Sequence, residues 1–173
     1  MLKPAVFIDR DGTLIEEVNF LSNVDDLILF PYTAAALRML KDAGFLIVVV
    51  TNQSGIGRGL FDEAAMNAIH TEIQRRLNRE IDGFYFCPHL PDEGCECRKP
   101  GIGMINSACR DLDIDRSGSW MIGDKAIDIE TGRNAGIRTA MVMTGYGLSH
   151  SKLLDEPADI VADDLMEAAR KIA

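Results

Sequence analysis

The chain has 173 residues, of which 47% are hydrophobic and 26% are charged, as expected for one globular domain spanning residues 1–173. Its formal net charge of −9 argues against a broad nucleic-acid or anionic-membrane surface, although a local basic cluster can still bind a small anion. The longest apolar run, residues 45–50, is too short to span a bilayer, and the N-terminus leaves no room for a signal peptide. We therefore expect a cytoplasmic protein without membrane or nucleic-acid partners, and a monomer by default.

Strand-like and helix-like segments alternate along the chain. Apolar runs predict strands at residues 5–9, 46–51, 84–87, 120–123, 139–143 and 159–161. Helical periodicity predicts helices between them, at residues 33–43, 63–79, 103–112, 128–135 and 165–172. Strands that are apolar on both faces and separated by helices predict a parallel sheet covered on both sides, so the fold class is α/β. A functional site is expected beyond the carboxyl ends of the strands.

The first predicted strand ends in Asp9-Arg10-Asp11-Gly12-Thr13. Because side chains alternate along an extended chain, Asp9 and Asp11 are expected to face one side and Arg10 the other. Two carboxylates so close together repel each other, which favours a bound cation or a shared proton. The alternative is a polar turn, since Asp-Gly is a common turn pair.

Polar side chains also follow the next three predicted strands. The second strand is followed by Thr51, Asn52, Gln53 and Ser54, the third by Arg98 and Lys99, and the fourth by Asp124, Lys125 and Asp128. The carboxyl ends of parallel strands meet at one edge, so these acids, amides and cations are expected to gather there. Four such strand ends predict an active site at this edge.

In these motifs the chain resembles the haloacid dehalogenase (HAD) superfamily of aspartyl-phosphate phosphatases over essentially its whole length. The resemblance implies a Rossmann-like parallel sheet, a bound Mg²⁺ and phosphoryl transfer through a covalent aspartate. It implies that Asp9 is the nucleophile and Asp11 the general acid and base. It also implies that Thr51 and Lys99 hold the transferring phosphoryl group, and that Asp9, Asp124 and the backbone carbonyl of Asp11 bind Mg²⁺. These oxygen ligands suit Mg²⁺, whose charge offsets the repulsion between a carboxylate nucleophile and a phosphate dianion.

Three thiols and an imidazole lie within eleven residues and match a structural zinc site of the Cys₃His kind. They are Cys87, His89, Cys95 and Cys97. Without a secretory signal, thiolate–metal bonds are favoured over disulfides, and a redox cluster is the alternative. We expect a structural Zn²⁺ that staples this loop and turns Arg98 and Lys99 toward the substrate, so that both cations belong to the catalytic set.

Within the superfamily, the zinc set together with Arg98-Lys99 resembles the heptose-1,7-bisphosphate 7-phosphatases and the related histidinol-phosphatases. In that branch, the residues that line the substrate pocket correspond to Asn19, Asn52, Gln53, Ser54, Arg98 and Lys125. The heptose branch commonly carries a lysine at the position of Lys125, so the resemblance favours the sugar bisphosphate and implies a reaction that removes the 7-phosphate of D-glycero-D-manno-heptose 1,7-bisphosphate. The alternative is histidinol phosphate. A polynucleotide 3′-phosphatase is disfavoured by the acidic charge, and an inactive sugar-phosphate binder by the presence of both Asp9 and Asp11.

No segment between the motifs is long enough for an inserted cap domain, so a capless site is expected, with the zinc loop and residues 17–20 as partial walls. Residues 55–59 are predicted to form a flexible turn near the phosphate, with Arg58 contacting a second phosphate. Asp128 is expected either to help organise the metal site or to cap the following helix. His70 is expected on the outer face of its helix and His150 in a loop.

Overall fold

The structure is a computed structural model that describes residues 2–173. Six strands form one sheet in the order β3-β2-β1-β4-β5-β6, and every neighbouring pair is parallel. The strands are β1 (Lys3–Ile8), β2 (Leu46–Asn52), β3 (Gly83–Cys87), β4 (Ile114–Gly123), β5 (Arg138–Val142) and β6 (Ile160–Ala162). The predicted parallel α/β sheet is therefore confirmed.

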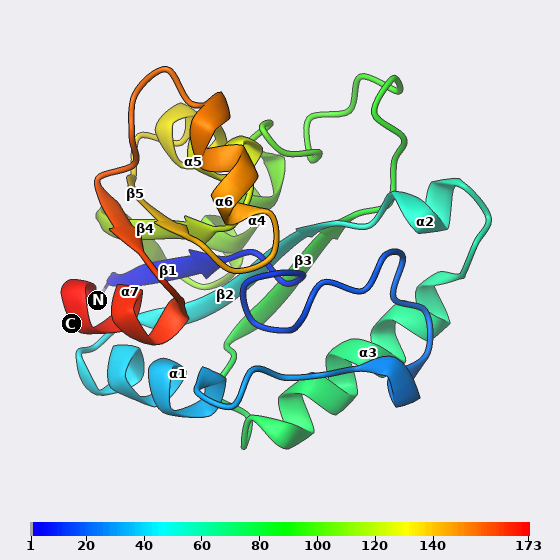
Figure 1. The fold of residues 1–173 in the computed structure, drawn as a ribbon, viewed down its shortest axis with the longest axis horizontal. Coiled ribbons are helices and arrows are strands. Elements are labelled where there is room, and N and C mark those ends of the chain that lie inside the picture. Colours follow the sequence, from blue (N-terminus) through cyan, green and yellow to red (C-terminus); the bar gives the residue numbers. More distant parts are fainter. Residues whose placement is uncertain (1) are drawn as a thin grey trace.

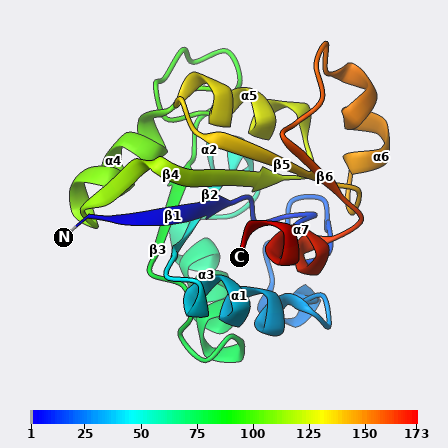
Figure 2. The same cartoon turned by 90° about the vertical axis from the view of Figure 1, so that its left-hand side faces the viewer.

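Helices cover both faces of the sheet (Figures 1 and 2). In the view of Figure 2, α1 (Thr33–Asp42), α3 (Glu63–Arg76) and α7 (Leu165–Ile172) lie below the sheet, and α4 (Gly103–Asp111) and α5 (Ala126–Asn134) lie above it. Shorter helical segments in the connections are η1 (Val24–Asp26), α2 (Ser54–Gly57), α6 (Gly147–His150) and η2 (Ser151–Leu153). Among residues 2–173, no helix combines the length and the apolarity needed to cross a membrane.

The two faces of the sheet carry separate apolar cores, because successive side chains of a strand point to opposite faces. In β1, Val6 and Ile8 join the core beneath α1, α3 and α7, whereas Ala5 and Phe7 join the core beneath α4. All four side chains are fully buried. Burial on both faces explains why the central strands read as continuous apolar runs.

Two element boundaries differ from the sequence prediction for identifiable reasons. β4 begins at Ile114, six residues before the predicted start, and its polar first half shifts register opposite Pro4. There the hydroxyl of Ser119 accepts a hydrogen bond from the backbone N–H of Ala5 at 2.9 Å. Helix α3 ends at Arg76 instead of residue 79, because Asn78 and Arg79 have positive φ angles of 51° and 60°.

The strand order reverses next to β1, which places the site. The chain runs outward from β1 to β2 and β3, and then returns so that β4 pairs with the other edge of β1. Loops that leave the carboxyl ends of β1 and β4 therefore diverge and open a crevice. Within residues 2–173, the segment 9–32 holds only η1, and the segment 53–82 only α2 and α3, which agrees with the predicted capless fold.

Candidate active site

Three buried carboxylates and one buried ammonium group meet at this crevice. Asp9 follows β1, Asp124 follows β4 and Asp128 lies in the first turn of α5, and one carboxylate oxygen of each lies within 4.8 Å of the others. Lys99 Nζ lies 2.7 Å from Asp9 Oδ1 and 2.7 Å from Asp128 Oδ1, and it also donates to the carbonyl of Val50 at 3.1 Å. Burial by itself lowers the pKa of Lys99, but Asp128 and Asp9 outweigh it and raise that pKa.

The carboxylate of Asp124 has one satisfied and one unsatisfied oxygen. Its Oδ2 accepts a hydrogen bond from the backbone N–H of Tyr146 at 2.8 Å, whereas its buried Oδ1 has no partner. Burial, followed by the charges of Asp9 and Asp128, raises the pKa of Asp124 to about 8. An orphaned acceptor among three carboxylates is costly unless a cation binds there, and all-oxygen ligands fit Mg²⁺. The described residues therefore fit a magnesium ion held by Asp9 and Asp124, with Asp128 beside them.

Asp128 combines the two roles considered for it. Its Oδ2 accepts a hydrogen bond from the backbone N–H of Lys125 at 3.0 Å, which caps α5, and its Oδ1 accepts from Lys99 at 2.7 Å. Burial, then the charge of Asp9, raises the pKa of Asp128 to about 6, although Lys99 opposes this rise. The same carboxylate thus starts the helix and anchors the lysine.

The predicted separation of Arg10 from the two acids is wrong. Strand β1 ends at Ile8, and the chain turns at Gly12, whose φ is 82°, so strand alternation does not extend to residues 9–11. The guanidinium of Arg10 forms a bidentate ion pair with the carboxylate of Asp11, with Nε 3.0 Å from Oδ2 and Nη2 3.1 Å from Oδ1. The contribution of Asp11 to a metal through its backbone carbonyl stays a prediction.

The last residues of β2 and Gln53, which follows it, connect the general acid candidate Asp11 to Lys99. The side-chain amide of Gln53 donates to Asp11 Oδ2 at 3.0 Å and to the hydroxyl of Thr51 at 2.7 Å. Asn52 binds the backbone of Lys99 from both sides, because Oδ1 accepts from its N–H at 3.0 Å and Nδ2 donates to its carbonyl at 3.3 Å. The end of β2 therefore holds Lys99 in register with Asp9.

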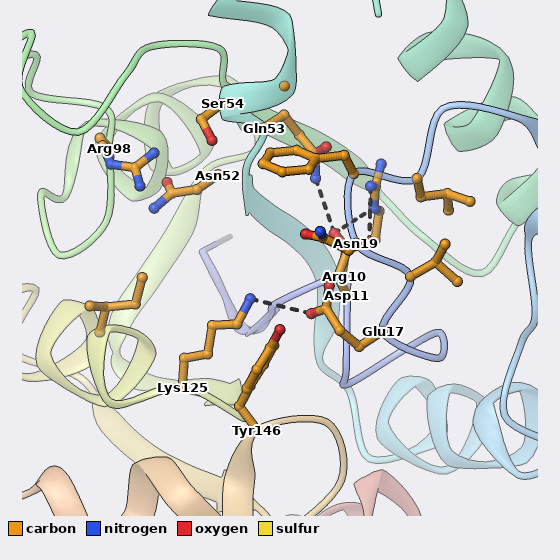
Figure 3. A pocket seen from close by; sticks show the side chains of 15 residues that line it. Arg10, Asp11, Glu17, Asn19, Asn52, Gln53, Ser54, Arg98, Lys125 and Tyr146 are labelled. Carbon is orange, nitrogen blue, oxygen red and sulfur yellow. Dashed lines mark hydrogen bonds and ion pairs between the residues drawn. The ribbon is translucent and has the colours of Figure 1, made fainter. Parts of the chain in front are cut away.

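A pocket of about 270 Å³ opens beside these groups (Figure 3). All six residues predicted to line a substrate pocket contribute to its wall: Asn19, Asn52, Gln53, Ser54, Arg98 and Lys125. Asp11, Glu17 and Phe20 line it as well, and so does Tyr146, which the sequence reasoning missed. Tyr146 follows β5 in the segment Gly145-Tyr146-Gly147, where the paired glycines were the only local signal.

Lys125 carries a positive charge on one side of this pocket. Its Nζ lies 3.3 Å from Glu17 Oε2 and 5.0 Å from the centroid of the Tyr146 ring. Burial lowers the pKa of Lys125, but the surrounding carboxylates, first Asp9 and then Glu17, outweigh this and raise it. Arg98 faces the pocket from the loop that carries Cys95 and Cys97, and it donates to the carbonyl of His89 at 3.3 Å. The pocket is thus suited to an anionic ligand.

The predicted zinc ligands lie together at the end of β3 and in the loop that follows it. The Sγ atom of Cys87 lies 3.0 Å from Cys97 Sγ and 3.5 Å from Cys95 Sγ, and His89 Nδ1 lies 3.2 Å from Cys97 Sγ. All four donor atoms lie within 4.8 Å of one another. Three sulfurs and one imidazole at this spacing fit a tetrahedral Zn²⁺. Arg98 and Lys99 follow directly, so the cluster holds the loop that delivers both cations.

Three minor expectations are wrong. Residues 54–57 form the short helix α2 instead of a flexible turn, since Gly55 packs against Phe61. Arg58 lies 5.8 Å from the ring centroid of Phe20, and its contact with a second phosphate stays a prediction. His70 is buried with 6% exposure and does not lie on the outer face of α3. His150 ends α6, and its Nδ1 accepts a hydrogen bond from the backbone N–H of Ala126 at 3.2 Å.

Comparisons with known proteins agree with this geometry. Residues 96–168 match the HAD-hydrolase-like family model. The chain is 38% identical to a D-glycero-beta-D-manno-heptose-1,7-bisphosphate 7-phosphatase of Haemophilus ducreyi, covering 96% of this chain and 97% of that protein. It is 39% identical to a D-glycero-D-manno-heptose-1,7-bisphosphate 7-phosphatase of Thermosynechococcus vestitus, covering 99% and 96% of the two chains.

A solved structure is similar in both sequence and fold. It is the D,D-heptose 1,7-bisphosphate phosphatase of B. bronchiseptica complexed with magnesium and phosphate. The TM-score is 0.90 and the identity 34%, over 98% of this chain and 97% of that one.

Proposed function

The chain belongs to the HAD-like heptose-1,7-bisphosphate 7-phosphatases, and we propose that it removes the 7-phosphate of D-glycero-D-manno-heptose 1,7-bisphosphate. The observation that carries the assignment of residues is the buried contact between Asp9 and Lys99 beside Asp124, whose Oδ1 has no partner. A nucleophilic carboxylate, a fixed ammonium group and a ligand set for a cation meet there, beside a pocket whose wall includes Arg98 and Lys125. This arrangement supports phosphoryl transfer to Asp9.

The reaction follows from these residues in two steps. In the first, a carboxylate oxygen of Asp9 attacks phosphorus, and the bond from phosphorus to the sugar oxygen breaks as Asp11 gives that oxygen a proton. In the second, Asp11 takes a proton from water, the resulting oxygen attacks phosphorus, and inorganic phosphate leaves Asp9. Mg²⁺, when bound by Asp9 and Asp124, supplies positive charge that reduces the repulsion between the carboxylate and the phosphate.

Lys99 and Thr51 are proposed to hold the transferring phosphoryl group. The Lys99 ammonium is already aimed at Asp9 by Asp128 and by the carbonyl of Val50, so little reorganisation is needed when charge develops on phosphorus. Asn52 fixes the backbone of that lysine. A structural Zn²⁺ on Cys87, His89, Cys95 and Cys97 is proposed to hold the loop in the same place.

The remaining pocket residues are proposed to bind the sugar and its second phosphate. Arg98 and Lys125 face the pocket from two different elements, the loop after β3 and the start of α5. The amides of Asn19, Asn52 and Gln53 offer hydrogen bonds to hydroxyl groups. Such a wall suits a polar, doubly phosphorylated small substrate. A monomeric state and a cytoplasmic location stay predictions.

The test is phosphate release by purified protein with Mg²⁺, comparing both anomers of heptose 1,7-bisphosphate with histidinol phosphate. We expect kcat/KM to be highest for one heptose anomer. A preference for histidinol phosphate would contradict the proposed substrate while leaving the proposed chemistry standing.

The chemistry is tested separately by Asp9→Asn, which should lower kcat by roughly 10³-fold or more with fold and zinc content unchanged. Asp155→Asn makes the same chemical change at an exposed position and is the matched control. Undiminished turnover in Asp9→Asn would overturn the proposed nucleophile.

A further inference from the structure

One buried titratable side chain lies behind the pocket and has no part in the reaction described above. His70 projects from α3, is 6% exposed, and stacks on the ring of Phe84 with the centroids 4.5 Å apart. Its Nε2 lies 3.3 Å from Nη1 of Arg10, which is 1% exposed. Polar groups buried this deeply are nearly always hydrogen-bonded, so we interpret this contact between α3 and the loop after β1 as a hydrogen bond.

The chemistry of the contact determines the state of the histidine. A guanidinium group has five N–H donors and no acceptor, so His70 Nε2 must accept the hydrogen bond. His70 is therefore neutral, with its proton on Nδ1. Burial, followed by the positive charge of Arg10, lowers the pKa of His70 to about 3, which is consistent with this state.

Arg10 in turn determines which lone-pair position of the Asp11 carboxylate is left to carry a proton. The carboxylate of Asp11 accepts three hydrogen bonds, two from Arg10 and one from Gln53. A carboxylate offers about four lone-pair positions, so about one remains for a proton exchanged with the substrate. The orientation of the guanidinium decides where that position points, and His70 holds the guanidinium from its other side.

We propose that His70 is a positioning residue for proton transfer by Asp11, acting through the guanidinium of Arg10. This inference rests on the proposed function, because it needs Asp11 to protonate the leaving oxygen. Without the acceptor on His70, a buried Arg10 donor is unsatisfied and the guanidinium turns to find another partner. The free position of the Asp11 carboxylate then moves away from the leaving oxygen.

Leaving-group dependence separates this role from a general loss of structure. A sugar alkoxide is a poor leaving group and needs a proton from Asp11 as the bond to phosphorus breaks. The p-nitrophenolate ion is stable without a proton, so phosphoryl transfer from p-nitrophenyl phosphate needs this acid far less. For both substrates kcat/KM reports the steps up to formation of the phosphorylated Asp9, so the later water attack does not mask the difference.

The variants are His70→Leu, which removes the acceptor, and His70→Gln, whose carbonyl oxygen can replace it. We expect His70→Leu to lower kcat/KM for heptose bisphosphate by roughly 10-fold and to change it little for p-nitrophenyl phosphate. His70→Gln should recover most of the loss. Ile73→Ala, on the same buried face of α3 but in the apolar core, is the matched control and should affect both substrates alike.

Equal losses on both substrates in His70→Leu, or no recovery in His70→Gln, would overturn the positioning role. A second measurement does not depend on activity or on the folding of a variant. Nitrogen-15 NMR of the wild-type imidazole at neutral pH should show the proton of His70 on Nδ1, and a proton on Nε2 would also overturn the inference. If the wild-type protein released phosphate from neither substrate, the proposed function would fail instead.

Discussion

Replacing Gly145 by alanine should weaken Mg²⁺ binding while leaving the sheet and the zinc loop intact. Gly145 lies between two parts of the site: an added Cβ would be 2.2 Å from Asp124 Oδ2 and 2.8 Å from the Cα of Gly12. An ordinary contact begins near 3.4 Å, so the carboxylate oxygen would have to retreat by 3.4 − 2.2, about 1.2 Å. That shift breaks the 2.8 Å hydrogen bond from the backbone N–H of Tyr146.

The size of the effect follows from how Gly145 and the backbone N–H of Tyr146 orient the carboxylate of Asp124. Disturbing a group that orients a metal ligand typically costs 10–100-fold in metal affinity, and we expect a loss in this range, about 1.4–2.8 kcal/mol. Alanine at the Gly145 φ of 53° adds about 1 kcal/mol of backbone strain to the folded state. This strain lowers the free energy of unfolding but does not by itself lower the affinity for Mg²⁺.

Isothermal titration calorimetry with Mg²⁺ measures the affinity directly, and the Mg²⁺ dependence of phosphate release gives a second value. Gly136→Ala is the matched control, because Gly136 has a φ of 70° and nothing within 4 Å of an added Cβ. Both variants should lose stability, but only Gly145→Ala should lose affinity for Mg²⁺. Equal Mg²⁺ affinities in the two variants would refute the reasoning that packing at Gly145 orients Asp124.

Three further predictions concern stability and the zinc loop. Burial and Arg10 lower the pKa of His70 to about 3 in the folded protein, so between pH 6.5 and 3 only the unfolded chain protonates this imidazole. The free energy of unfolding should therefore fall by up to about 1.4 kcal/mol for each pH unit below 6.5. In urea unfolding measured against pH, the free energy of unfolding of His70→Gln should fall less steeply below pH 6.5 than that of the wild type. Equal slopes for the two proteins would contradict the burial of a neutral imidazole. Asp128→Asn removes one of the two anions that pair with buried Lys99, so it should lower the free energy of unfolding by about 3 kcal/mol. A loss below about 1 kcal/mol would mean that Asp9 alone satisfies the lysine. Cys97→Ser should release zinc, lower the Tm and raise KM through displacement of Arg98, as metal analysis, calorimetry and kinetics would show; a zinc-free protein with unchanged Tm and KM would contradict a structural role.

Much of the fold could be predicted because it depends on local patterns. Helix α7 has the predicted limits, and the apolar runs identified every strand, although β4 begins earlier than expected. Polar residues at the ends of parallel strands must gather at one edge whatever the details of packing, since all the strands point the same way. For that reason Asn52, Arg98 and Lys125, which are far apart in the sequence, could be placed at one edge of the sheet, and the family resemblance then predicted that they line one pocket.

The contacts inside the site depended on tertiary structure. The alternation of a strand predicts side-chain direction only as far as the strand continues, and β1 ends before Arg10. Whether His70 is buried depends on Arg10, sixty residues away, and on Phe84 from an edge strand. Tyr146 orients Asp124 through a backbone N–H, which carries no signal in the sequence. Local periodicity thus determined which residues reach the active edge, whereas long-range packing decided which of them pair, because a buried polar group takes its partner from another element.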